Sequence, residues 1–179
     1  MKAVKLSIYA AAAFAVIITI ASCSTPASPA PATPAASPAV EKMRAAGPCG
    51  IVDDATRAQF SIGIGTETID PVVVGSRECT WSTPDRRVYY MAVLPDSMDL
   101  DSVLRGYEEP VASTIAGKRA AQTYSSRTFK DRECLVFVED EGMHLLNFQY
   151  EPASEERSST HAQVCEKATA FAERVIASL

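Results

Sequence analysis

The chain has 179 residues, of which 47% are hydrophobic, and its 22 acidic residues outnumber 17 lysines and arginines to give a net charge of −5. An acidic surface argues against nucleic acid as a partner, because such binding begins with the neutralisation of phosphate groups. It also argues against an electrostatic patch for anionic lipid headgroups, so we expect membrane attachment to be covalent.

The first 23 residues combine a basic start, an apolar run and a cysteine. Met1–Lys5 contain two lysines, Leu6–Ile20 carry no charge, and residues 20–23 read Ile-Ala-Ser-Cys. This order is typical of a bacterial lipobox, an exported signal that is cut just before a cysteine carrying a diacylglyceryl group. We therefore expect residues 1–22 to be a lipoprotein signal peptide and Cys23 to be lipidated.

Two other interpretations of this segment are a plain secretory signal and a transmembrane helix. A helix needs roughly 20 apolar residues to span a bilayer, and this run is shorter and is followed by a proline-rich stretch. The fit at all four lipobox positions favours lipidation of Cys23. Its acyl chains would hold the protein on the extracytoplasmic face of the cell membrane.

Residues 23–42 comprise this cysteine and a linker rich in proline, alanine, serine and threonine. The prolines favour extended polyproline II, which could hold a domain roughly 50 Å from the bilayer. The serines and threonines could carry sugars, or the linker could be unmodified. We expect residues 43–179 to form a single globular domain.

The first half of this domain contains turn, cap and strand patterns. Residues 47–50 (Gly-Pro-Cys-Gly) predict a turn, and Asp53 is placed to cap a short helix that ends near Phe60. Strands are expected at residues 77–82 and 87–94, with a turn between them.

The second half predicts a short helix and two hairpins. Asp99 is placed to cap a helix through about Tyr107. The expected strands are residues 111–116 and 119–124, joined at Gly117, and residues 133–138 and 143–150, joined at Asp140-Glu141-Gly142.

The C-terminal segment predicts a long amphipathic helix. Ser158 or Ser159 would cap it, and it would run nearly to Leu179. Its apolar residues recur at helical spacing, namely Val164, Ala168, Phe171, Val175 and Leu179. We therefore expect an α+β fold with a mainly antiparallel sheet of about five or six strands and this helix packed across one face.

Four cysteines follow Cys23, an even number that indicates two disulfides in an exported domain. Three connectivities are possible, and we favour Cys49–Cys79 with Cys134–Cys165. Each closes a loop of about 30 residues, worth roughly 3–4 kcal/mol in the chain-entropy model. Cys134 and Cys165 also lie on the faces of a strand and a helix that we expect to meet.

A chain-wide order of short motifs resembles a known family. Pro48-Cys49, Cys79-Thr80-Trp81, residues 115–120 (Ile-Ala-Gly-x-x-Ala), Cys134 and Cys165 follow one another as in the actinobacterial lipoproteins grouped as domain of unknown function 3558. The resemblance covers most of residues 47–179. It implies location and fold but no functional residue. The general shape is also similar to the PsbP/Mog1-like sandwiches of other exported lipoproteins.

No pattern predicts a catalytic or metal site, and we expect neither an enzyme nor a cofactor. His144 begins a strand and His161 lies in the first turn of the last helix, with no G-x-S-x-G turn in the chain. Zinc is disfavoured because the cysteines lack C-x-x-C spacing and neither histidine lies in ligand register. We interpret Asp96, Asp99 and Asp101 as capping and solvated residues rather than a calcium loop.

Three functional hypotheses remain. The first is a non-catalytic envelope lipoprotein that binds a protein partner or helps an envelope complex. The second is a lipid or small-molecule carrier, which would need an apolar cavity between the last helix and the sheet. The third is a hydrolase with an unrecognised site, which would need His144 or His161 beside a serine or carboxylate.

Overall fold

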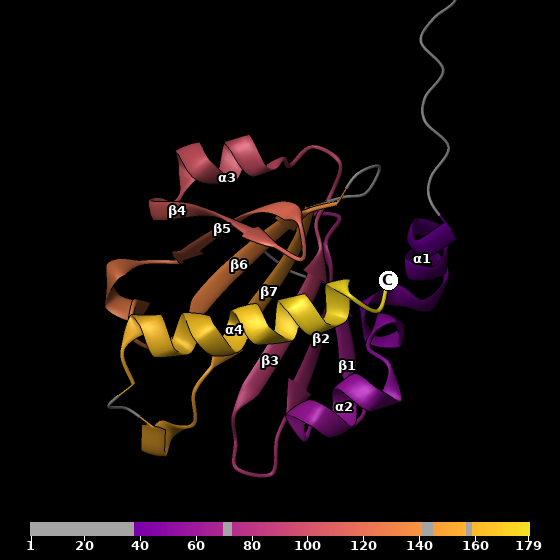
Figure 1. The fold of residues 1–179 in the computed structure, drawn as a ribbon, viewed down its shortest axis with the longest axis horizontal. Helices are drawn as coiled ribbons and strands as arrows, with labels where there is room; N and C mark the ends of the chain where they lie inside the picture. The colour runs from indigo at the N-terminus through magenta and orange to yellow at the C-terminus, as the bar shows by residue number, and fades with distance from the viewer. Residues whose placement is uncertain (1–37, 70–72, 141–144, 157–158) are drawn as a thin grey trace, which may run out of the picture. The chain divides into compact units, whose positions relative to one another are not determined.

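The computed structural model describes residues 38–69, 73–140, 145–156 and 159–179 (Figure 1). The predicted signal peptide, Cys23 and residues 24–37 of the linker lie outside these ranges. Within the described ranges, no helix has the length and apolar character needed to cross a bilayer.

The strands join in one seven-stranded antiparallel sheet in the order β1-β2-β3-β7-β6-β5-β4. They are β1 (Thr66–Ile69), β2 (Arg77–Ser82), β3 (Val88–Val93), β4 (Glu108–Ile115), β5 (Lys118–Tyr124), β6 (Cys134–Glu139) and β7 (Leu145–Glu151). The predicted α+β class is confirmed, and the sheet has more strands than we expect.

Strand β1 is the element that sequence patterns miss. Its four residues are all exposed, so it shows no alternation between apolar and polar positions. Strand β4 also begins earlier than predicted, at Glu108. A register shift between Glu108 and Val111 interrupts its pairing with β5. This irregularity hides the beginning of β4 from a period-two pattern.

Helix α1 (Pro38–Ile51) is kinked at Gly47, whose φ of 67° is left-handed. The turn predicted at residues 47–50 is wrong beyond Gly47, since Pro48 begins a second helical segment, where a proline ring is tolerated. Residues 38–42 of the predicted linker are likewise helical rather than extended.

The remaining helices start at identifiable caps. They are α2 (Asp54–Phe60), α3 (Leu100–Gly106) and α4 (His161–Ile176), with short 3-10 turns η1 (Arg127–Phe129) and η2 (Ser154–Glu156). Asp53 and Asp99 cap α2 and α3 as predicted. The cap of α4 is Thr160 in a reciprocal bond pair with Gln163, so our prediction of Ser159 is wrong, and Ser158 lies outside the described residues.

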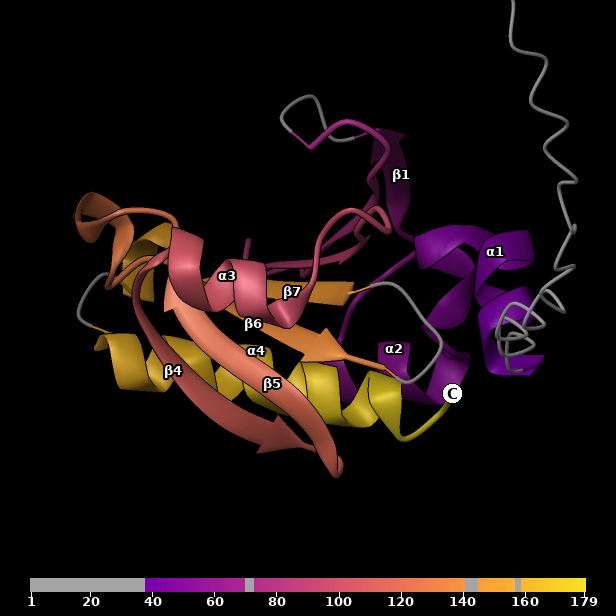
Figure 2. The same cartoon turned by 90° about the horizontal axis from the view of Figure 1, so that it is seen from above.

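Helix α4 packs on one face of the sheet and α3 on the other (Figures 1 and 2). The α4 side contains the larger core, in which the ring of Phe171 packs against four aromatic neighbours: Phe60, Trp81, Tyr89 and Phe148. Trp81 and Cys79 lie in this core as predicted. Aromatic rings therefore occupy the space between α4 and the sheet.

Candidate functional site

A disulfide between Cys134 and Cys165 joins the sheet to helix α4. Cys134 opens β6 on the face that α4 covers, and Cys165 lies in the buried stripe of the helix. Their Cα atoms are 5.0 Å apart, within the usual range for a disulfide. Because the two residues are only 0% and 5% exposed, the bridge is buried.

A second disulfide, Cys49–Cys79, joins helix α1 to strand β2 with a Cα separation of 5.1 Å. Cys79 shares the inward face of β2 with Trp81, and both lie against Gly65. A Cβ atom at Gly65 would collide with the sulfur of Cys79 and the indole of Trp81. These two disulfides are the pairs that the sequence favours.

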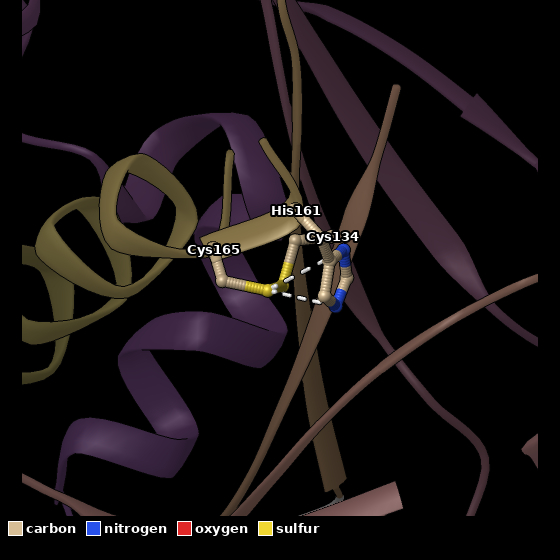
Figure 3. Close-up of side chains that lie close together, drawn as sticks. All are labelled: Cys134, His161 and Cys165. Carbon is tan, nitrogen blue, oxygen red and sulfur yellow. Dashed lines mark hydrogen bonds between the residues drawn. A yellow bond between two sulfur atoms is a disulfide. The ribbon is translucent and has the colours of Figure 1, made fainter. Parts of the chain in front are cut away.

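Only the Cys134–Cys165 disulfide has a described histidine beside it (Figure 3). Nε2 of His161 lies 3.4 Å from Sγ of Cys165, and Nδ1 lies 2.5 Å from the carbonyl oxygen of Lys130. Since a carbonyl oxygen can only accept, Nδ1 carries the proton in this contact and the neutral ring leaves its lone pair on Nε2. Nδ1 lies 4.0 Å from the same sulfur, so Nε2 is the ring nitrogen nearer to Cys165.

Neighbouring groups hold the imidazole in this position. The backbone N–H of His161 donates to Asp131 at 3.0 Å, and its ring packs perpendicular to that of Tyr124 with centroids 5.4 Å apart. Nζ of Lys130 lies 5.1 Å from the centroid of the Tyr124 ring and 2.7 Å from the carboxylate of Glu109. The hydrogen bond from Lys130 lowers the pKa of Glu109.

The Cys134, Cys165 and His161 side chains could hold a metal ion by position. One ligand atom of each lies within 4.8 Å of the other two. In the disulfide, however, neither sulfur is a thiolate, which is the form that binds a metal ion. The prediction that neither histidine lies in ligand register is wrong for His161, because residues 161 and 165 are four apart and one helix face carries both.

A surface cavity of about 540 Å³ lies over the start of β6 and the end of β7. The carboxylate of Glu133 accepts from the backbone of Ser125 at 2.7 Å and from the amide of Gln149 at 3.3 Å. Burial, followed by the charge of Glu133, raises the pKa of Glu151. Burial also raises the pKa of the adjacent Tyr90 to about 12. Because these carboxylates already have hydrogen-bond partners within the protein, we do not propose a ligand site in this cavity.

The two edges of the sheet differ in how they meet solvent. Edge strand β4 contains Pro110 and a register shift, and its Glu108 and Glu109 form ion pairs with Arg127 and Lys130. Proline, irregular pairing and charge all discourage further strand addition.

Edge strand β1 contains neither a proline nor a register shift, and exposed apolar side chains lie at or near its ends. Ile64, Ile69 and Val74 are 96%, 77% and 88% exposed. The charge on Glu67 is paired with Arg77 of the neighbouring strand. Exposed apolar residues beside an open strand edge are typical of a protein-binding surface.

A comparison with known families matches residues 18–178 to the family described as "Protein of unknown function (DUF3558)". The chain belongs to this family. Neither the curated proteins nor the solved structures give a significant match, so the likeness to PsbP/Mog1-like sandwiches stays a prediction. The family match supports the resemblance inferred from the order of motifs.

The motifs of this DUF3558 domain occupy positions with structural roles. Cys79-Thr80-Trp81 lies on β2, where its first and third residues enter the core. Ala116 and Gly117 form the tight turn between β4 and β5, with left-handed φ values of 49° and 79°. Ala120 then faces the core under α4. The motif residues therefore form two disulfides, part of a core strand and a tight turn.

Of the two histidines considered for catalysis, the structure describes only His161. His144 lies outside the described residues. The ring nitrogens of His161 contact a backbone carbonyl oxygen and a disulfide sulfur. Neither contact is with a serine or carboxylate side chain, which a hydrolase would need beside its histidine.

Proposed function

We propose that this chain is a lipid-anchored lipoprotein of the cell envelope. Residues 43–179 would act outside the cytoplasm as a non-catalytic binding module or as part of an envelope complex. The observation that carries this proposal is the pairing of Cys49 with Cys79 and of Cys134 with Cys165. Disulfides persist in oxidising compartments and are rare in the cytosol.

The sequence before the domain supports the anchor. The lipobox of residues 20–23 would put Cys23 at the cleavage point, and residues 24–37 separate it from helix α1. Each buried methylene contributes about 0.8 kcal/mol, and two or more chains are needed for stable attachment. The diacylglyceryl group on Cys23 would meet that requirement without help from the acidic domain.

The open edge of β1 supports a protein partner. Strand addition would pair the outward-facing backbone groups of residues 66–69 with an extended segment of another protein. The exposed side chains of Ile64, Ile69 and Val74 would supply apolar contact around that pairing. Since β4 at the other edge is protected by a proline and by irregular pairing, we propose the partner at β1.

The filled core favours a binding module over a carrier. A lipid carrier would need an apolar cavity beneath α4, and the ring of Phe171 with its aromatic neighbours occupies that region. An apolar ligand would have to displace these rings at a cost similar to that of disrupting the core.

Metabolic labelling with a fatty-acid analogue tests the anchor. The wild-type chain should carry the label and sediment with membranes, whereas Cys23→Ala should carry none. Cys134→Ala together with Cys165→Ala serves as the matched control, because it removes cysteines without touching the lipobox. Equal labelling of wild type and Cys23→Ala would overturn the proposed anchor.

Photo-crosslinking in intact cells tests the binding surface. A benzophenone side chain at position 69 of β1 should give one discrete protein adduct, and the same probe at the comparably exposed position 111 of β4 should not. Lysine at positions 64 and 74 (Ile64→Lys, Val74→Lys) should abolish that adduct, since lysines block strand addition. Adducts of equal yield from both edges, or a lipid adduct at position 69, would contradict the proposal.

A further inference from the structure

We propose that Cys134, Cys165 and His161 form a redox-gated site for a thiophilic metal ion of the zinc type. The two cysteines would bind the ion only after their disulfide is reduced, and His161 would supply the third ligand. The inference rests on the geometry of these side chains and does not depend on the lipid anchor or on the surface of β1.

The distances fit a tetrahedral ion. With metal–sulfur bonds of about 2.3 Å and a metal–nitrogen bond of about 2.0–2.1 Å, sulfur and nitrogen ligands lie about 3.6 Å apart. Nε2 of His161 already lies 3.4 Å from Sγ of Cys165. The ligand atoms of all three residues lie within 4.8 Å of one another, so small side-chain movements would complete the site.

The orientation of the imidazole is the second observation that indicates a metal ligand. Histidines that bind metals usually donate the other ring N–H to a carbonyl or carboxylate, which fixes the tautomer and directs the lone pair to the ion. Nδ1 of His161 has this contact with the carbonyl of Lys130, and Nε2 is the ring nitrogen nearer to Sγ of Cys165 (Figure 3). The edge-on ring of Tyr124 limits rotation of the imidazole.

The ligand set selects the class of ion. Two thiolates and one imidazole favour soft or borderline ions over calcium and magnesium, which prefer oxygen ligands. Three protein ligands leave a fourth tetrahedral position for water, as in sites that are not purely structural.

The redox step balances with a dithiol as the reductant. The S–S bond between Cys134 and Cys165 breaks, and the dithiol gives up two electrons and two protons as its own sulfurs become joined. The protons pass to the two cysteine sulfurs. The divalent ion then displaces both protons to solvent when it binds the thiolates.

Cobalt titration tests the site, because thiolate–cobalt charge-transfer absorption reports sulfur ligands. The full chain with Cys23→Ser, purified in detergent, is measured oxidised and after reduction under anaerobic conditions. One Co²⁺ should bind per reduced chain and none per oxidised chain. Cys134→Ala with Cys165→Ala should abolish the absorption, and Cys49→Ala with Cys79→Ala should retain it. Loss of the signal in the Cys49/Cys79 variant alone would overturn the assignment.

The role of His161 is tested separately. His161→Ala should weaken Co²⁺ binding by at least about 10- to 100-fold, the loss that even outer-shell changes cause, whereas His144→Ala should leave it unchanged. Nitrogen NMR of ¹⁵N-histidine in the chain with both histidines should show zinc shifting the Nε2 resonance of one histidine only after reduction. Unchanged affinity in His161→Ala, or reduced folded protein that binds no metal, would overturn the proposal.

Discussion

The two disulfides close loops of almost the same length, with sequence separations of 30 and 31 residues, yet they lie in different surroundings. Cys49–Cys79 lies against Gly65 and the indole of Trp81. Cys134–Cys165 lies beside an imidazole whose orientation is fixed by hydrogen bonding. Chain entropy makes the pairs nearly equivalent for stability, so any difference in chemistry comes from the neighbouring side chains.

Removal of a whole disulfide should produce the largest effects. Cys134→Ala with Cys165→Ala should lower the free energy of unfolding by about 4 kcal/mol, and Cys49→Ala with Cys79→Ala by about 3 kcal/mol. The first pair is expected to cost more because both of its residues are buried, whereas Cys49 is half-buried. Urea denaturation followed by circular dichroism measures both, and a reversed order would break the comparison.

A methyl group at position 65 should disturb the Cys49–Cys79 disulfide and leave Cys134–Cys165 in place. Gly65→Ala places a Cβ against the sulfur of Cys79 and the ring of Trp81, and should cost about 1–3 kcal/mol through overpacking. Gly63→Ala is the matched control, since no atom lies within 4 Å of its added Cβ. Denaturation followed by the fluorescence of Trp81, the single tryptophan, should separate the two variants. Equal stabilities would contradict the close packing.

Loss of the α4 cap should weaken the helix that carries Cys165 of the Cys134–Cys165 disulfide. Thr160→Ala removes the side chain that accepts from the backbone of Gln163 and should cost about 1 kcal/mol. Ser159→Ala should change the stability by less than about 0.5 kcal/mol, the usual range for a surface change. Urea midpoints of the two variants decide which residue begins the helix.

Acid should reduce the stability contributed by the α2 cap but not that contributed by the α4 cap, and this effect should be smaller than those above. A hydrogen bond from Thr56 lowers the pKa of Asp53, the cap of α2. A lowered folded-state pKa contributes stability above the unfolded value of about 3.9, and that contribution is lost as the pH falls through the folded value. Asp53→Asn should therefore reduce the loss of stability below about pH 4, whereas Thr160→Ala should not. Parallel pH profiles for both variants would contradict this account.

The sequence predicts elements whose signal is local. The strand carrying Cys79 and Trp81, the cap residues Asp53 and Asp99, and the apolar stripe of α4 all follow from periodicity or capping, and the structure places them as expected. The pairing of Cys134 with Cys165 also follows from a strand face and a helix face that the sequence predicts to meet.

Elements governed by tertiary context were missed. Strand β1 has no buried face to create alternation, and residues 38–42 continue into α1 despite their linker-like composition. The approach of His161 to within 4.8 Å of the Cys134 sulfur joins two elements, so only the packing of α4 on β6 brings it about. The four-residue spacing of His161 and Cys165 was the one local signal that could have indicated it.

Intact mass measurement of the protein purified from its own membrane tests the central claim most directly, namely that the domain is exported, oxidised and tethered at Cys23. The account predicts a chain that lacks residues 1–22, carries a diacylglyceryl mass on Cys23 and gains four alkyl groups only after reduction. A mass that retains residues 1–22 without lipid, or four alkyl groups gained without reduction, would contradict it.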